Sequence, residues 1–189
     1  MKSFGILCLL GVVFLIGCDG KQEQSSKQAS SLTHAAVSNS AAGVSWSVPD
    51  RWSVGPARQM RVATYSLPAA EGDGEGGECA VFYFGKDQGG DVEANIDRWV
   101  LQFEGSPAVE RSSKEINGLD VTLVKIVGTF LSPGGPMMQS QGKKESYRLL
   151  GAIVEVPEGL IFFKCTGPTS TISSAEGEFD ELVDSMSKE

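Results

Sequence analysis

Histidine is nearly missing from this sequence. The 189 residues contain one histidine, His34, and none follows it. Catalysis by Ser-His-Asp or Cys-His groups needs a positioned imidazole, and zinc sites commonly use one as a ligand. The chain also has no Gly-x-Ser-x-Gly, no phosphate-binding P-loop and no His-Glu-x-x-His. We therefore expect a protein that is not an enzyme, with no cofactor and no bound metal.

Basic residues are scarce relative to acidic ones. Lys and Arg number 16 against 24 Asp and Glu, and the formal net charge is −8 at pH 7. A phosphate backbone is repelled by such a surface, so we expect no nucleic-acid partner. The glycine-rich stretch from Glu71 to Glu78 gathers four of the acidic residues. It lacks the ligand spacing of an EF-hand, and we interpret it as a solvated connection between strands.

Long hydrophobic runs are missing too. The one extended apolar run, Phe4 to Ile16, follows Lys2 and is shorter than the roughly 20 residues that a membrane-spanning helix needs. A charged start followed by a short apolar core is typical of a secretory signal. We therefore expect export of the chain rather than a transmembrane segment.

The apolar run ends in Leu15-Ile16-Gly17-Cys18, which resembles the lipobox of bacterial lipoproteins. The resemblance implies a diacylglycerol thioether on Cys18, cleavage before it, and acylation of the new amino group by a chain such as palmitate. The alternative, an ordinary signal peptide, needs an Ala-x-Ala-like site nearby, and the first alanine after the run is Ala29. Asp19 resembles the inner-membrane retention signal of Gram-negative lipoproteins. We therefore expect the chain in the bacterial cell envelope, anchored to a membrane through Cys18 and exposed to the periplasm.

Three segments follow from this interpretation. Residues 1–17 form the signal peptide, and residues 18–43 form the lipidated N-terminus and a flexible linker rich in Ser, Ala, Gln and Lys. Residues 44–189 form one globular domain, which is long enough for a single proper core. His34 lies in the linker, where an imidazole has no fixed environment for catalysis.

Two cysteines remain in the expected domain, Cys79 and Cys165. An even pair in an exported protein is compatible with a disulfide. Reduced cysteine is also among the most buried residue types, so two free thiols inside the core are the alternative.

Alternating and helical patterns divide the domain into strands and two helices. Asp91 is placed to cap a helix whose apolar residues run from Val92 to Phe103, and Asn117-Gly118 is typical of a tight hairpin turn. A last helix is expected over Ser173 to Ser187, capped by Ser173 or Ser174. The expected strands are 44–48, 61–67, 79–84, 114–116, 119–131, 146–156 and 160–166.

This order predicts an α+β fold, a mostly antiparallel sheet covered by helices. It is similar to the Mog1/PsbP-like fold, whose members include a small-GTPase-binding protein and an extrinsic photosystem subunit. The resemblance covers roughly Val44 to Ser187 and implies binding rather than catalysis. The segments Ala94 to Trp99 and Phe163 to Pro168 also look like those of small envelope lipoproteins of unassigned function.

The leading hypothesis is a membrane-anchored envelope lipoprotein whose acidic domain binds a protein partner or a small ligand. The alternatives are a hydrolase that uses paired carboxylates and a purely structural envelope protein. For each candidate contact residue a structural role is the alternative: core packing for the two tryptophans, a surface ion pair for the arginine, and packing of a Gly-Pro-rich loop for the methionines. The candidates are Trp46, Trp52, Arg98, Met137 and Met138.

Overall fold

A computed structural model describes residues 39–132 and 142–189. The expected signal peptide, Cys18, Asp19 and most of the expected linker lie outside these residues, as do Met137 and Met138. None of the helices in the described part is both long and apolar enough to cross a membrane.

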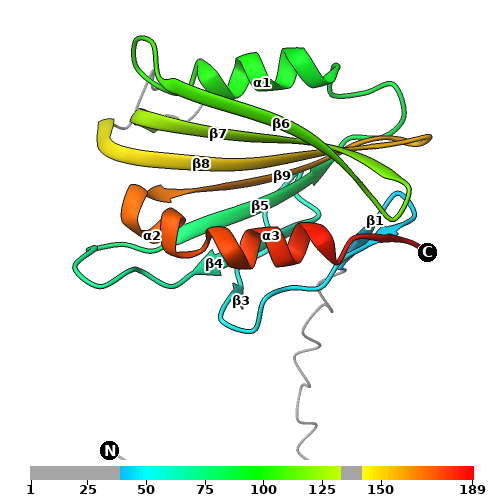
Figure 1. Ribbon diagram of the computed structural model, residues 1–189, viewed down its shortest axis with the longest axis horizontal. Coiled ribbons are helices and arrows are strands. Elements are labelled where there is room, and N and C mark those ends of the chain that lie inside the picture. The colour runs from blue at the N-terminus through cyan, green and yellow to red at the C-terminus, as the bar shows by residue number, and fades with distance from the viewer. Residues whose placement is uncertain (1–38, 133–141) are drawn as a thin grey trace, which may run out of the picture. The chain divides into compact units, whose positions relative to one another are not determined.

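One large antiparallel sheet forms the centre of the domain (Figure 1). Its seven strands lie in the order β3-β4-β5-β9-β8-β7-β6, and each neighbouring pair is antiparallel. The mostly antiparallel α+β architecture expected from the sequence is therefore confirmed. The strands are β3 (Ser53–Val54), β4 (Ala63–Leu67), β5 (Gly77–Tyr83), β6 (Ala108–Ile116), β7 (Leu119–Ser132), β8 (Gly142–Val156) and β9 (Gly159–Pro168).

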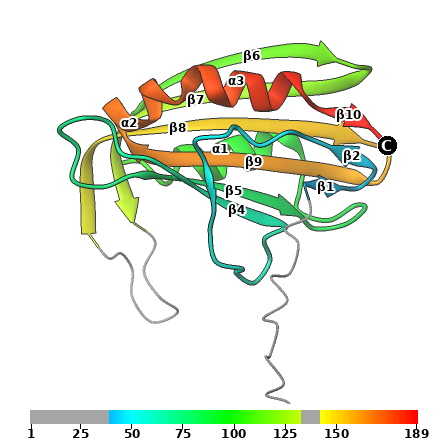
Figure 2. The ribbon, with the colours of Figure 1, turned by 90° about the horizontal axis from the view of Figure 1, so that it is seen from below.

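Helices cover both faces of the sheet. Helix α1 (Val92–Val100) lies on one face, whereas α2 (Thr169–Ser174) and α3 (Glu176–Asp184) lie on the other (Figures 1 and 2). The central strand β8 has an uninterrupted buried run from Leu149 to Val154, because its neighbours and the helices shield both of its faces. Alternate residues of this run belong to two separate hydrophobic clusters, one under each helical layer.

Helix α1 begins where the sequence predicts. The Asp91 side chain accepts a hydrogen bond from the Ala94 amide at 2.8 Å, and Ile96 and Trp99 are buried against the sheet. The indole of Trp99 lies directly over Gly151 of β8, where a Cβ atom would come within 2.2 Å of the ring. The glycine thus lets the helix approach the sheet closely.

The hairpin turns also follow the sequence. Asn117 and Gly118 have φ angles of 50° and 75°, and they connect β6 to β7 with Ile116 opposite Leu119. Positive φ at both turn residues is what a two-residue hairpin requires, and Asn-Gly adopts it readily. The turn at Pro157-Glu158 connects β8 and β9, with Val156 opposite Gly159, and here the positive φ, 128°, is at Gly159.

Both ends of the described chain differ from expectation. Ser40–Ala41, placed in the expected linker, forms strand β1, and only Val44–Ser45 of the expected first strand is extended as β2. Strand β2 pairs with β1 on one side and with β10 (Ser187–Lys188) on the other, in a separate small sheet. The sequence prediction missed β1 and β10 because two-residue strands carry no periodic pattern.

The expected last helix is two helices. Helix α2 begins at Thr169, earlier than predicted, and α3 begins at Glu176 after a break at Ala175. Ala175 is the N-cap of α3 and no side chain caps it, so the capping role expected of Ser173 or Ser174 is wrong. The Ser174 hydroxyl instead donates to the Thr171 carbonyl at 2.8 Å within α2.

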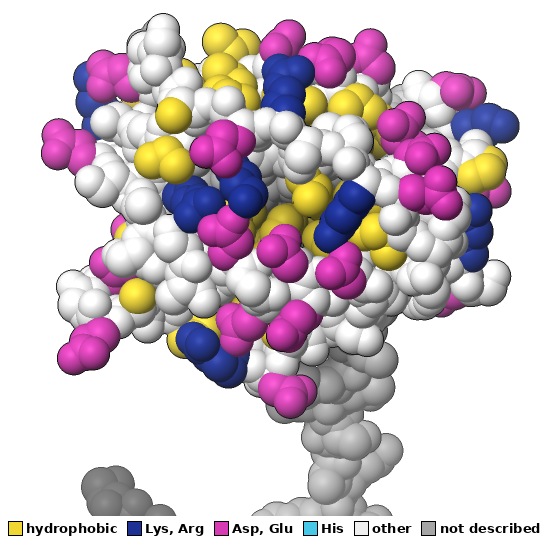
Figure 3. Space-filling view, viewed as in Figure 1, with side chains coloured by type: hydrophobic (Ala, Val, Ile, Leu, Met, Phe, Trp, Pro, Cys, Tyr) yellow, Lys and Arg dark blue, Asp and Glu magenta, His cyan; other side chains and the backbone are white. Residues whose placement is uncertain are grey.

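Charges are dispersed over the face that carries α3. Acidic side chains with Lys and Arg among them are scattered over this face, and a hollow at its centre exposes hydrophobic side chains (Figure 3). Ion pairs connect the helix to the sheet: Lys114 to Asp184 at 2.6 Å, and Arg148 to Glu176 at 2.8 Å. Acidic and basic side chains are therefore intermingled on this side.

Candidate functional site

Two cavities adjoin at the end of the sheet where the loop before β5 meets the start of β8. We name them after one lining residue each, the Tyr147 cavity of about 540 Å³ and the Ser170 cavity of about 490 Å³. Glu75 and Tyr147 line both cavities and separate them. The Tyr147 cavity is further lined by Ser66, Leu67, Ala69, Gly76, Gly77, Glu78, Phe130, Lys144 and Thr166. The Ser170 cavity is further lined by Asp73, Gly74, Glu145, Ser146, Pro168, Thr169 and Ser170.

A three-residue polar cluster forms the wall between the cavities. Lys144 Nζ donates to Glu75 Oε2 at 2.8 Å and contacts the Tyr147 hydroxyl at 2.8 Å, and that hydroxyl donates to the Glu75 carboxylate. Lys144 and Tyr147 come from β8, whereas Glu75 comes from the glycine-rich loop. These contacts fasten the loop to the sheet.

Aromatic rings form the floor of the Tyr147 cavity. The ring of Tyr147 stacks on that of Phe130 with centroids 5.6 Å apart, and Phe103 meets Phe130 edge to face at 5.4 Å. Lys144 Nζ lies 5.0 Å from the centroid of the Tyr147 ring. An aromatic floor with charged groups beside it can hold both the apolar and the charged parts of a ligand.

A second group of charges lies next to the Tyr147 cavity. Half-buried Lys164 of β9 lies over the Phe130 ring at 5.7 Å and donates to the side-chain oxygen of Gln102. Glu78 is already paired with Arg61 at 2.8 Å and with Arg58 at 3.4 Å. Among the described residues, Lys164 therefore has a neutral amide rather than a carboxylate as its hydrogen-bond acceptor.

The pKa values around the cavity follow from these contacts. Hydrogen bonds from Lys144 and Tyr147 lower the pKa of Glu75, and the bond to Glu75 raises the pKa of Lys144. Burial raises the pKa of Tyr147. Burial, together with the nearby positive charge of Arg61, lowers the pKa of Lys164 to about 8. Near neutral pH the cluster is thus a carboxylate, an ammonium and a neutral phenol, and Lys164 remains mostly charged.

Asp73 fixes the other side of the glycine-rich loop. Its carboxylate accepts hydrogen bonds from the Ser170 hydroxyl at 2.7 Å and from the Thr171 amide at 3.0 Å, at the start of α2. The Thr171 hydroxyl also donates to this carboxylate. Together the three bonds lower the pKa of Asp73, and the one from the Thr171 hydroxyl has the largest effect. The loop is the exposed connection between two strands that the sequence predicts, and Asp73 and Glu75 attach it to the fold at two points.

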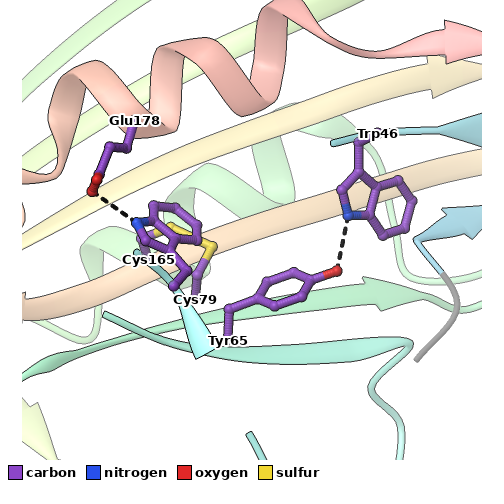
Figure 4. The surroundings of a disulfide bond; sticks show 6 residues. Trp46, Tyr65, Cys79, Cys165 and Glu178 are labelled. Atoms are coloured by element: carbon purple, nitrogen blue, oxygen red, sulfur yellow. Dashed lines mark hydrogen bonds between the residues drawn. A yellow bond between two sulfur atoms is a disulfide. The ribbon is translucent and has the colours of Figure 1, made fainter. Parts of the chain in front are cut away.

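The two candidate tryptophans lie in the core rather than on a contact surface. Trp46 is 4% exposed, donates to the Tyr65 hydroxyl at 2.9 Å, and meets the Phe163 ring edge to face. Trp52 is 6% exposed and donates to Glu178 at 3.0 Å (Figure 4). Each indole N–H has an internal partner, which is what allows these side chains to be buried.

The other candidate residues also lie apart from the cavities. Arg98 is exposed on α1 and donates to the Gly89 carbonyl at 2.7 Å and to the Asn95 side chain at 3.0 Å. It thus holds the turn before its own helix, and no ion pair to a carboxylate is found for it within the described ranges. Met137, Met138 and Cys18 lie outside those ranges.

Cys79 and Cys165 lie opposite each other on β5 and β9 and form a disulfide. Both are fully buried on the face covered by α2 and α3, and Figure 4 shows the bond and its surroundings, which include Tyr65. Because the sulfur atoms are enclosed, the bond contributes to the core and not to the surface of the cavities.

Sequence reasoning missed the residues that form the candidate site. Lys144 and Tyr147 precede or begin the expected strand, and Glu75 lies in a loop, so no periodic pattern marks them. Phe130 and Lys164 were assigned only to strands. The usable signal is Lys164 itself, a lysine within the apolar segment Leu160 to Cys165, because an ammonium in such a segment requires a specific environment.

The carboxylate pair expected of a hydrolase is not supported by the described residues. That mechanism needs a carboxylic acid with a raised pKa beside an ionised one. Asp73, Glu75 and Glu176 are the described carboxylates with clearly shifted pKa values, and all three are lowered. The geometry provides fixed charges and rings that suit recognition.

Comparison with solved structures gives a distant likeness and no family. No protein-family model matches the chain, and no curated protein matches it. Among solved structures, the chain is similar to a Pseudomonas aeruginosa protein of unknown function, PA94, described as a putative regulator. The two share 15% sequence identity with a TM-score of 0.45, over 72% of this chain and 85% of the other. This likeness assigns neither a family nor a function to the chain.

Proposed function

We propose that this chain is a bacterial envelope lipoprotein, anchored through lipid on Cys18, whose domain binds a small anionic ligand in the Tyr147 cavity. The observation that carries the ligand class is the local charge. Lys144 lines the cavity together with Glu75 and Glu78, while Lys164 lies beside it over the Phe130 ring and Arg58 and Arg61 lie beside it through their ion pairs with Glu78. A cationic surplus in a chain of net charge −8 favours an anion at this place.

Lys164 supports an anion most directly. Its ammonium is half-buried against Phe130, and burial and Arg61 both disfavour its charge. An oxyanion beside Nζ would relieve this cost, since charge-assisted hydrogen bonds are the stronger kind. The hydroxyls of Ser66 and Thr166 line the same cavity and can donate to further oxygens.

The position of the cavity suits a tethered protein. The first described strand, β1, and the start of β8 lie at opposite ends of the domain (Figures 1 and 2), and Lys144 and Tyr147 near the start of β8 line the cavity. Ala42 and Val44 lie beside Val156 at the end of β8, whereas Tyr147 lies near its start. Nine residues of extended strand separate Tyr147 from Val156, about 30 Å. Strand β1, where the described chain begins, is therefore at the far end of the domain from the cavity.

The anchor itself is proposed from the sequence. The lipobox-like segment Leu15 to Cys18 supports lipidation, and Asp19 supports retention at the periplasmic face of an inner membrane. The Mog1/PsbP-like assignment remains part of the proposal as well. It is supported by the order of elements and by an antiparallel sheet with helices on both faces.

Thermal unfolding of the full chain in detergent tests the ligand class. The probes are inorganic phosphate and citrate, with glucose as a neutral control at matched ionic strength. We expect one of the anions to raise the unfolding temperature of the parent and to have no such effect on Lys164→Met. Lys86→Met removes the same charge from an exposed loop and should respond as the parent does. Equal responses from all three proteins, or none from the parent, would reject the proposal.

A further inference from the structure

Strand β6 is an open edge of the large sheet. It pairs with β7 along its whole length, from Ala108 opposite Val127 to Ile116 opposite Leu119. Residues Ala108 to Ser113 are all exposed. Apart from the β7 ladder, no backbone hydrogen bond to β6 is found among residues 39–132 and 142–189. Its outward amides and carbonyls are therefore available for a further strand (Figures 1 and 2).

This edge lacks several usual obstacles to strand addition. Proteins commonly protect sheet edges with prolines, bulges, short strands or a covering element. Strand β6 has nine residues, contains no proline, and keeps a continuous register with β7. The register shift of β7, between Gly128 and Phe130, lies in its pairing with β8 beyond the end of β6. The charged side chains of β6 are then what determines which strand can pair with this edge.

The charges of β6 complement those of a second β6. Glu110 and Lys114 lie at equal distances on either side of Ser112. In an antiparallel pair with its twofold axis at Ser112, Glu110 of each copy faces Lys114 of the other, and both residues lie on the same sheet face. Moving the axis to between Ser112 and Ser113 instead brings Glu110 opposite Glu115, and Arg111 opposite Lys114.

With the twofold axis at Ser112, every residue of β6 also pairs with a residue of the other copy. This axis places Ala108 of one copy opposite Ile116 of the other, so all of β6 takes part in the ladder. An axis at Ser113 pairs Arg111 with Glu115, but it moves the ends of the two strands out of alignment. Full overlap together with two opposite-charge pairs therefore selects the Ser112 axis.

We propose that two copies of this chain pair through β6, antiparallel and centred on Ser112, so that one sheet runs through both. Opposite charges at Glu110 and Lys114 specify this partner and register, and they disfavour strands with other charge patterns. The proposal is independent of the ligand proposed for the Tyr147 cavity.

Cysteine cross-linking in membranes of cells that produce the full chain tests the register. In a Ser112→Cys variant the two new thiols face each other across the twofold axis, and mild oxidation should give a covalent dimer on a non-reducing gel. In Ser113→Cys each thiol faces Arg111 of the other copy, and we expect at least a fivefold lower dimer yield. Similar yields from the two variants, a higher yield from Ser113→Cys, or no dimer from either would overturn the proposal.

Charge reversal provides the second test, by sedimentation equilibrium of the purified full chain in detergent. Lys114→Glu brings two pairs of glutamates together across the axis, and we expect dimer dissociation to increase at least tenfold. The same variant loses the ion pair of Lys114 with Asp184 within its own chain. Lys86→Glu makes the same change in net charge away from β6, and Asp184→Asn removes the same ion pair without changing β6; both should dimerise as the parent does. A monomeric parent, or equal dissociation of Lys114→Glu and either control variant, would contradict the pairing, and circular dichroism verifies that each variant is folded.

Discussion

Single side chains determine how the candidate site is held. Tyr147 joins the glycine-rich loop to β8 through its hydroxyl, while its ring stacks on Phe130. Tyr147→Phe keeps the ring and removes the hydroxyl bonds to Glu75 and Lys144. We expect a loss of about 1 kcal/mol in the free energy of unfolding, measured by urea titration. Tyr83→Phe removes an exposed hydroxyl bond to the Glu158 carbonyl and should cost less; a larger loss there would contradict this account.

The partly buried charge of Lys164 lowers the free energy of unfolding by an amount that depends on pH. The pKa of Lys164 is about 8 in the folded protein and near 10.5 when the chain is unfolded, so the unfolded chain binds more protons between these values. This destabilisation is fully present below pH 8 and is relieved as pH rises from 8 to 10.5. We expect Lys164→Met to be more stable than the parent at pH 7, with a difference that shrinks by pH 10. Urea unfolding of both proteins at the two pH values measures this difference in the free energy of unfolding. A difference that grows with pH would contradict a lowered pKa of Lys164.

The contact between helix α1 and strand β8 depends on Gly151. The Trp99 ring of α1 occupies the place where a side chain of residue 151 on β8 would be. We expect Gly151→Ala to destabilise the domain by about 1 to 3 kcal/mol, because the helix must move away from the sheet. Gly177→Ala in α3, where no atom lies within 4 Å of the new Cβ, is the control and should not destabilise. Thermal unfolding of the two variants compares them, and equal losses would refute the packing argument.

The helices and strands that the sequence predicted are those with a regular local pattern. The sequence predicted α1, the Asn117-Gly118 hairpin and the long strands, since their caps, turns and alternation are local. It did not predict the early start of α2, where the Asp73 carboxylate, far away in the chain, accepts a hydrogen bond from the Thr171 amide. The site escaped prediction for the same reason: Glu75, Lys144 and Lys164 come together only through sheet pairing.

At the scale of the whole molecule, the disulfide joins strands that lie 86 residues apart in sequence. A loop of that length corresponds to about 4 to 5 kcal/mol in the chain-entropy model. We expect replacement of both cysteines by alanine to lower the unfolding temperature markedly. In the parent, thiol-reactive reagents should label neither Cys79 nor Cys165 until the protein is unfolded and reduced. Labelling of either residue in the native, unreduced protein would contradict a closed bond.

The anchor is the other property of the whole molecule. We expect mass spectrometry of the mature N-terminus to show a triacylated Cys18, and Cys18→Ser to abolish both processing at that bond and membrane association. Should the variant be cut there and fractionate with membranes as the parent does, the envelope assignment fails.

The distance between β1 and the Tyr147 cavity bears on which kinds of ligand can reach the cavity. Under the proposed anchor on Cys18, the chain reaches the described domain at β1, whereas Tyr147 lies near the other end of β8. We therefore expect the ligand to be a water-soluble metabolite or a polar extension of another macromolecule rather than a hydrophobic tail embedded in the membrane.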